Sequence, residues 1–479
     1  MKRIFNYQLL MPQPSHWTFW IGTALLFKFL YFIFFIKFFS NVTLDVHLFT
    51  NFWGTLAPDT YTYFEPIEHL ILQQDFSFLF KFRMYGYGLP YLFLRYFFEP
   101  STALNVLITI QTILSAISVY YLSLMASNWL KNSAVFYFVF IVYFLLISIS
   151  FYDIVALTES FSTSCLIISI YFLAHSNSNV KIFLSGGFLA WGIFMRPVFF
   201  PLVLFFIIYH IYQNYSLQTK KLLIHIFIFL IPIIIFESIW LVGMKKYNGK
   251  FYLTTPSLFH PSYLDSNHHS MEKINFLKTI GEDWEKTNWF TSNDPELALP
   301  YVTQTSIFNM DSLRQLKLEL IQFDTISNTA SKLKLNIDLK RKLNSYAQAI
   351  KIDYPLVYYI INPIKNLIRI SVKSSTHRMF GEYSIMNSSL KFFRFFLDLI
   401  FWLIEIVCIL TPFFYVRVKY CRSFFVLLLS IIAYFYIIHS LVFKSSDNRY
   451  LLPVMPLMAM VFSYSISLFT SYLNSFKRN

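Results

Sequence analysis

Residues 222–243 read LLIHIFIFLIPIIIFESIWLVG, an apolar run with a single charged side chain, Glu237. About 20 such residues are enough for a helix to cross the hydrocarbon core of a bilayer. A helix is favoured there because it satisfies its own backbone hydrogen bonds. The run therefore predicts a membrane-spanning helix, and the number of similar runs decides the fold class of the chain.

Similar apolar runs recur along the whole chain. The stretch near 181–213 is too long for one span, so we divide it at Arg196-Pro197. The first run is too long for the apolar core of a signal peptide and lacks a small-residue cleavage site, which predicts a signal anchor. We expect about ten spans, at residues 17–39, 103–126, 134–150, 159–175, 181–195, 198–213, 222–243, 392–415, 423–443 and 451–470.

The composition agrees with a membrane protein. Of the 479 residues, 56% are apolar, 21% are aromatic and 13% are charged, whereas soluble domains contain nearer a quarter of charged residues. The net charge of +14 accompanies no soluble nucleic-acid-binding motif, so we expect no nucleic-acid partner. The three cysteines form neither a disulfide framework nor a zinc spacing.

The distribution of basic residues predicts the orientation, because cytoplasmic loops are enriched in Lys and Arg. With the N-terminus inside, the two long loops, 40–102 and 244–391, fall on the outer side. The short loops and the tail on the inner side then carry basic residues and no acidic ones: Lys131, Lys181, Lys220, Lys221, Arg417, Lys419, Arg422, Lys477 and Arg478.

Three parts follow from this topology: an N-terminal membrane half, 1–243, an extracytoplasmic loop domain, 244–391, and a C-terminal part with the last three spans, 392–479. Within the loop domain, 250–345 reads as a small folded unit. An interfacial amphipathic helix is predicted at its end, with an apolar stripe of Tyr354, Val357, Tyr358, Ile361, Ile364 and Ile368. A second is predicted in the first loop, with Phe64, Ile67, Leu70 and Ile71 on its apolar side.

The predicted fold class is therefore all-α: a polytopic membrane protein with about ten transmembrane helices, interfacial amphipathic helices and a small extracytoplasmic loop domain. Ionisable residues near the membrane are costly and by default functional. Those that the topology brings to the outer face come from separate connections of the chain, and this convergence indicates a site made of Asp59, Arg83, Asp153, Glu159, Arg196, Asp447 and Arg449.

Each of these residues also has a structural interpretation. Asp59 is placed to cap the helix that follows it, and Glu159 to favour the dipole of the span that begins beside it. Arg196 can extend to the membrane interface, or its guanidinium can clamp a phosphate between two spans. Gln111, inside a span, is expected to bond a neighbouring helix.

Six short motifs follow one another along the chain: Pro58-Asp59 with Tyr63, Arg83-Met84-Tyr85-Gly86-Tyr87-Gly88, Gln111-Thr112-Ile113-Leu114-Ser115-Ala116, Thr158-Glu159, Met195-Arg196-Pro197 and Arg449-Tyr450-Leu451-Leu452-Pro453. In order and sidedness they resemble motifs of the GT-C membrane glycosyltransferases, in the branch of bacterial protein-mannosyltransferase-like proteins and the lipid A aminoarabinose transferase. This sequence departs from the branch at Thr60, where many members carry Glu, and at Tyr85 and Gly88, which replace two prolines.

The resemblance implies transfer of a sugar, with inversion, from a polyprenyl- or dolichyl-phosphate donor to a glycan, lipid or protein acceptor at the extracytoplasmic face. Asp59 would be the general base. Arg196, with Arg83 and Arg449, would hold the phosphate, and Glu159 with Asp153 would complete the substrate site. No metal ligand and no cofactor are assigned, although a divalent metal stays an open alternative.

The implied location is the inner membrane of a bacterium, with the site facing the periplasm. Two other functions stay open. A polysaccharide polymerase or ligase also has many spans and outer-loop arginines. A lipid or sugar transporter would require broken helices in two corresponding halves and charges near the middle of the bilayer.

Overall fold

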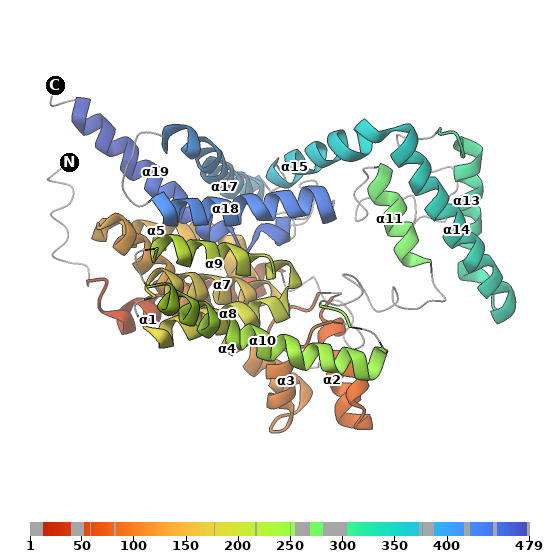
Figure 1. Ribbon diagram of the computed structural model, residues 1–479, viewed down its shortest axis with the longest axis horizontal. Helices are drawn as coiled ribbons and strands as arrows, with labels where there is room; N and C mark the ends of the chain where they lie inside the picture. The colour runs from red at the N-terminus through yellow and green to blue at the C-terminus, as the bar shows by residue number, and fades with distance from the viewer. Residues whose placement is uncertain are drawn as a thin grey trace. The chain divides into compact units, whose positions relative to one another are not determined.

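The computed structural model describes residues 13–39, 52–57, 59–80, 83–176, 178–215, 218–249, 251–253, 269–280, 304–372, 376, 388–415, 422–443 and 448–476. These residues form helices and one isolated bridge, between Thr55 and Val155, and contain no β-strand (Figure 1). The predicted all-helical class is confirmed. The chain divides into two compact units: the first contains Met1–Thr255, Ser374–Ala433 and Arg449–Asn479, and the second contains Pro256–Lys373 and Tyr434–Asn448.

Apolar helices long enough to cross a membrane are present. Within the described residues, four helical segments are both long enough and apolar enough to cross a membrane: Trp17–Phe35, Pro100–Leu130, Thr219–Asn248 and Ser423–Phe443. Shorter apolar helices lie at Ser133–Leu145, Thr158–Ala174, Asn179–Met195, Pro197–Gln213 and Met455–Ser467. These helices are compatible with an integral membrane protein, and the count of about ten spans stays a prediction.

Helices of the first unit are named here with their bounds. They are α1 Trp17–Phe39, α2 Tyr61–Gln73, α3 Gly88–Arg95, α4 Pro100–Leu130, α5 Ser133–Leu145, α6 Ile147–Phe151, α7 Thr158–Ala174, α8 Asn179–Met195, α9 Leu202–Gln213, α10 Thr219–Asn248, α17 Ser388–Tyr415, α18 Arg422–Ile437 and α19 Met455–Phe476. Short 3-10 turns lie at Phe76–Phe80, Pro197–Phe199 and Asn448–Leu451.

The centre of the first unit is α7, which packs against α4 and α8, while α8 also packs against α10 (Figure 1). Small residues permit this close approach of helices. The Ser169 hydroxyl donates to the Ser185 carbonyl of α8 at 2.7 Å. A Cβ atom at Gly186 of α8 would collide with the backbone of Phe229 in α10. Hydroxyls and glycine thus replace bulky side chains where these helices meet.

The predicted break at Arg196-Pro197 is present. Helix α8 ends at Met195, Arg196 has extended backbone geometry, and Pro197 begins a short 3-10 turn before α9. Proline disfavours helical geometry in the residue before it. The chain therefore turns at this dipeptide, and the Arg196 side chain lies at the end of α8.

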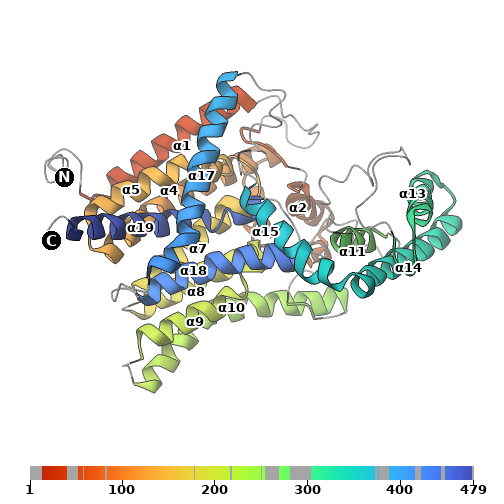
Figure 2. The same cartoon turned by 90° about the horizontal axis from the view of Figure 1, so that it is seen from above.

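The second unit contains a helical core of its own. Its elements are α11 Ser270–Ile280, α13 Met310–Thr325, α14 Thr329–Asp353, a π-helical turn Val357–Ile361, α15 Asn362–Val372 and a second π-helical turn Ile438–Phe443 (Figure 2). Asn309 and Asn328 cap α13 and α14 with their side chains. Buried residues of α11, α13 and α14 make the core, together with Phe308, which precedes α13. Among the helical residues are Phe276, Leu277, Leu316, Leu343 and Ile350.

The amphipathic helix predicted at the end of the loop domain is α15. The Asn362 amide donates to the Thr279 carbonyl at 3.0 Å, and the buried residues of the helix are Asn362, Pro363, Asn366 and Ile370. Ile364 and Ile368 are 50% and 56% exposed, and Lys365 and Arg369 are exposed as well. Exposed apolar and basic side chains on one helix are typical of helices at a lipid surface. The interfacial position of α15 stays a prediction.

The helix predicted in the first loop is α2, and its apolar side faces its own unit. Phe64 and Ile67 are buried, and the Phe64 ring contacts Tyr87 and Tyr91, with centroid distances of 5.5 and 4.5 Å. Glu68, one turn after Phe64, pairs with Arg95 of α3 at 2.6 Å and accepts a hydrogen bond of 2.6 Å from the Tyr91 hydroxyl. Its apolar stripe therefore packs against the segment around α3.

Candidate functional site

Five of the predicted site residues meet in the first unit. The Asp59 carboxylate lies 3.0 Å from Arg449 Nη2 and 3.6 Å from Arg83 Nη2. The Glu159 carboxylate lies 3.6 Å from Arg196 Nη1 and 3.9 Å from Arg449 Nε. Arg449 thus contacts both carboxylates and joins the two pairs into one cluster, which we call the arginine cluster.

Two tyrosines complete the arginine cluster. Arg83 Nη1 donates to the Tyr63 hydroxyl at 2.9 Å, and its guanidinium lies 4.6 Å from the centre of the Tyr63 ring. The Tyr450 ring centre lies 5.5 Å from the guanidinium of Arg196 and 5.1 Å from that of Arg449. Cations over aromatic rings are attracted by the ring quadrupole. The tyrosines therefore help to hold three like charges close together.

One end of the cluster is closed and the other is open. The side chains of Glu159, Arg196 and Arg449 are 5%, 8% and 10% exposed. Those of Asp59 and Arg83 are 28% and 22% exposed. A ligand would therefore reach Asp59 and Arg83 first, with Arg449 behind them.

The backbone of the first loop is anchored to the segment before α7. Thr55 N donates to the Ile154 carbonyl at 2.9 Å, and Ala156 N donates to the Thr55 carbonyl at 3.0 Å. The Thr60 hydroxyl donates to the Ala156 carbonyl at 3.0 Å. These bonds bring Asp59 to the beginning of α7, where Glu159 lies.

Asp59 lies directly before Thr60, which holds the N-cap position of α2 and makes no capping hydrogen bond with its side chain. The carboxylate of Asp59 also pairs with Arg83 and Arg449. The ion pairs and a role at the start of α2 are compatible. Glu159 does lie in the first turn of α7, as the dipole interpretation requires, and also pairs with arginines.

Gln111 of α4 holds the segment before α7 in place. Its Nε2 donates to the carbonyls of Tyr152, Asp153 and Val155 at 3.0, 3.0 and 3.1 Å. Its Oε1 accepts a hydrogen bond of 2.9 Å from the Tyr87 hydroxyl. Gln111 thus bonds neighbouring parts of the fold, as expected, and supports the backbone on which Glu159 is mounted.

The loop that carries Arg83 rests on the end of α8. Gly86 N donates to the Phe194 carbonyl at 3.3 Å, and Trp191 Nε1 donates to the Gly86 carbonyl at 2.9 Å. A Cβ atom at Gly86 would lie 2.5 Å from the Phe194 carbonyl carbon, closer than real side chains approach. Glycine here lets the Arg83 loop come against the helix end that carries Arg196.

Asp153 does not join the arginine cluster. Its Oδ2 lies 2.6 Å from Lys28 Nζ, and its Oδ1 accepts a hydrogen bond of 2.5 Å from the Ser160 hydroxyl. The side chains of Lys28 and Asp153 are 1% and 2% exposed. Both carboxylate oxygens are therefore engaged inside the protein, and the structure does not support the predicted substrate-binding role. Asp447 lies outside the described residues.

Lys28 was not among the predicted site residues, although a single basic residue in the middle of the first apolar run is itself a signal. No role of its own was predicted for Tyr450, which directly follows Arg449 and contacts two guanidinium groups. The Arg-Tyr dipeptide was visible in the sequence, but the second arginine comes from α8. Only the packing brings Arg196 to the same ring.

The electrostatics favour an anionic ligand. Three guanidinium groups face two carboxylates, which leaves an excess of positive charge. Burial raises the pKa of Tyr63, and Arg83 opposes this only in part, so the phenol stays neutral at physiological pH. Burial acts to lower the pKa of Arg83, but Tyr63 and Asp59 outweigh it and the pKa is raised.

Two guanidinium nitrogens have spare donor capacity. Arg83 Nε and Arg196 Nη1 are buried and make no hydrogen bond within the described part of the chain. Buried donors without acceptors are costly, and an anion with several oxygens would satisfy them. In the described ranges, no group of three or more His, Cys, Asp or Glu residues could hold a metal ion.

Comparison of the chain with protein-family models, with curated proteins and with solved structures finds no match in any of the three.

Proposed function

We propose that this protein is an integral membrane glycosyltransferase. It transfers a sugar from a polyprenyl- or dolichyl-phosphate donor to an acceptor at the extracytoplasmic face. The observation that carries the proposal is the contact of Arg449 with both Asp59 and Glu159, which unites residues from distant parts of the chain in one partly open cluster. The order of the GT-C-like motifs supports the same function.

The arginines bind the donor phosphate. A phosphate is already a good leaving group, so it needs positive charge rather than a general acid. Planar guanidinium groups bind phosphate oxygens through two parallel hydrogen bonds. Arg83 and Arg196 each offer a buried nitrogen without a hydrogen-bond partner in the described residues. They stabilise the negative charge that grows on the phosphate as the bond to the sugar breaks.

Asp59 is the general base, because it is the more exposed carboxylate of the cluster. Arginines on both sides favour its ionised form, the form that accepts a proton. The acceptor hydroxyl gives this proton to Asp59 while its oxygen bonds to the anomeric carbon. The bond from that carbon to the phosphate oxygen breaks, its electron pair leaves with the lipid phosphate, and the configuration inverts.

Donor binding also prepares the base. The donor phosphate competes with Asp59 for Arg83 and Arg449, whose guanidinium groups lie 3.6 and 3.0 Å from the carboxylate. Occupation of these arginines by phosphate releases the carboxylate toward the acceptor. Before the donor binds, the Asp59 carboxylate is held in its ion pairs with these two arginines.

Glu159 is a positioning residue. It is nearly fully buried and contacts Arg196 and Arg449 rather than the open end of the cluster. It fixes the two guanidinium groups before the donor arrives and lowers the repulsion between them. Its effect on Asp59 passes through Arg449.

The topology belongs to the same proposal: about ten spans, with the arginine cluster facing the periplasm from the inner membrane of a bacterium. The amphipathic character of α15 supports a position of its surface at the membrane interface. A lipid-linked donor, with its tail in the bilayer and its phosphate at the membrane surface, requires an arginine cluster near that surface.

The proposal is tested with the full chain in liposomes that contain polyprenyl-phosphate sugars labelled in the sugar. Release of free polyprenyl phosphate, with transfer of label to a glycan, lipid or peptide acceptor, is the expected result. Loss of this release in Asp59→Asn would assign it to the cluster. Movement of the intact labelled lipid between leaflets without release would contradict the proposal and favour a transporter.

A further inference from the structure

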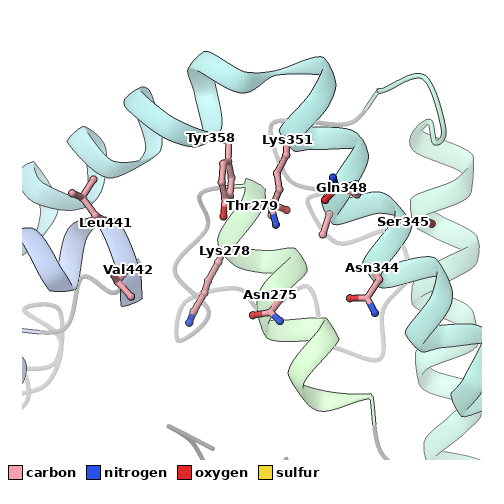
Figure 3. A pocket seen from close by; sticks show the side chains of 11 residues that line it. Asn275, Lys278, Thr279, Asn344, Ser345, Gln348, Lys351, Tyr358, Leu441 and Val442 are labelled. Carbon is pink, nitrogen blue, oxygen red and sulfur yellow. The ribbon is translucent and has the colours of Figure 1, made fainter. Parts of the chain in front are cut away.

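The second unit contains a cavity that the proposed reaction does not use. It has a volume of about 790 Å³ and lies along α11 and α14, with the π-helical turns Val357–Ile361 and Ile438–Phe443 at its side (Figure 3). Pockets for small molecules typically measure about 300–1,000 Å³. The space is therefore large enough for a few sugar rings.

The described lining is polar and contains no acidic residue. Lys278 of α11 and Lys351 of α14 contribute two ammonium groups. Asn275, Asn344 and Gln348 contribute amides, which can donate to and accept from hydroxyl groups. Polar groups of this kind on two helices would be expected on a solvated face, but here they surround one hollow.

One wall carries an aromatic ring. Tyr358 and Lys351 extend toward α11 in Figure 3, and Lys351 Nζ lies 5.3 Å from the Tyr358 ring centre. The Tyr358 ring offers an apolar face between polar groups, and the C–H face of a sugar ring can pack against such a surface. Leu441 and Val442, at one end of the lining in Figure 3, are 46% and 58% exposed and add a small apolar edge.

Lys278 is kept at this place despite a cost. Its neighbours on α11, Leu277 and Ile280, belong to the buried core of the unit. Burial lowers the pKa of Lys278 to about 8. An ammonium group in such surroundings gains more from an anionic ligand than a fully solvated one does.

We propose that this cavity binds an anionic saccharide. The amides hydrogen-bond the sugar hydroxyls, Tyr358 packs against a ring face, and Lys278 and Lys351 bind the acidic substituents. The site adds a second ligand to the protein and does not depend on the proposed transfer reaction, because binding needs neither Asp59 nor a lipid donor.

Binding is measured by calorimetry on the full chain in nanodiscs, with trigalacturonate as the probe and neutral maltotriose as its uncharged counterpart. We expect trigalacturonate to bind at least about tenfold more tightly than maltotriose, because its carboxylates pair with Lys278 and Lys351 and maltotriose has no charge. A tenfold difference in affinity corresponds to about 1.4 kcal/mol. Lys278→Gln and Lys351→Gln should each weaken trigalacturonate binding by about tenfold. Lys334→Gln, on an exposed part of α14 outside the cavity, should leave it unchanged.

A further variant keeps the test valid if a lysine variant is unstable. Asn344 is exposed in the absence of ligand, so Asn344→Asp should not disturb folding, but its negative charge should weaken trigalacturonate binding. The proposal would be overturned if both trisaccharides bound equally well or if neither bound. It would also be overturned if Lys334→Gln weakened trigalacturonate binding as much as Lys278→Gln and Lys351→Gln do. Full displacement of trigalacturonate by an equal concentration of inorganic phosphate would overturn it too, because a simple anion site would then suffice.

Discussion

Arg449 Nη2 lies 3.0 Å from Asp59 Oδ2, and the Nε of the same guanidinium lies 3.9 Å from Glu159 Oε1. Asp59 follows the first apolar helix and Arg449 precedes the last one, so this contact joins the two ends of the membrane part. The contact with Arg449 places the carboxylate of Asp59, the more exposed of the two in the cluster, beside the guanidinium groups.

Asp59→Asn should reduce sugar transfer by roughly two to four orders of magnitude, the usual range for loss of a general base. Asparagine keeps the shape of the side chain but accepts no proton. The measurement is product formation in liposomes beside the thermal unfolding midpoint. Asp311→Asn is the matched control, because Asp311 has a side chain 85% exposed and lies in the second unit. A stable Asp59→Asn protein with near-normal transfer would move the base elsewhere.

Arg196→Ala should raise the donor concentration needed for half-maximal rate by at least about tenfold, and Arg196→Lys should fall between it and wild type. Lysine keeps the charge and loses the two parallel hydrogen bonds. Initial rates against donor concentration separate the variants. If both behave as wild type, Arg196 serves only as an anchor near the membrane surface.

Gly86→Ala should reduce transfer about as strongly as Arg83→Ala. Its Cβ would meet the Phe194 backbone at 2.5 Å, and the Arg83 loop would have to move away from α8. Overpacking of this kind costs about 1–3 kcal/mol of stability. Gly187→Ala in α8 is the control, since nothing lies within 4 Å of its Cβ position. Equal activities of Gly86→Ala and Gly187→Ala would show that the position of the loop is unimportant for Arg83.

Leu72 and Asp311 should both be accessible from the extracytoplasmic side, as the positive-inside rule requires. Leu72 is 78% exposed and the Asp311 side chain 85% exposed. Each is changed to cysteine in a background without Cys165, Cys408 and Cys421, and intact cells are treated with an impermeant maleimide. Lys131→Cys should be labelled only after permeabilisation. The opposite pattern at Leu72 or Asp311 would reverse the proposed sidedness.

Affinity for trigalacturonate should fall as pH rises from 7 to 9. The pKa of Lys278 is lowered by burial to about 8, so its positive charge is present below that pH and lost above it. Burial raises the pKa of Tyr358, which stays neutral over this range. Lys278→Gln should remove most of the pH dependence and leave the contribution of Lys351. An unchanged pH profile in this variant would exclude Lys278 as its source.

The sequence by itself determined the helical class and most of the arginine cluster. Apolar run length is a local property, and it predicts a helix without knowledge of what the helix packs against. Asp59, Glu159 and Arg196 could be selected because charged residues at the ends of apolar runs are unfavourable without a partner or a ligand. The predicted topology placed them on one side of the membrane, and the structure brings them together in one cluster.

The partners of these residues depended on the tertiary structure. Asp153 resembled Glu159 in the sequence, but α1 packs beside α6 and brings Lys28 to it, so the two carboxylates have different roles. Periodicity likewise identified the two sides of α15 but not the side that the protein buries. Asn362 turns inward because the Thr279 carbonyl of α11 accepts its hydrogen bond. Pairing of charges and amides depends on which helices meet, and a one-dimensional pattern does not contain that information.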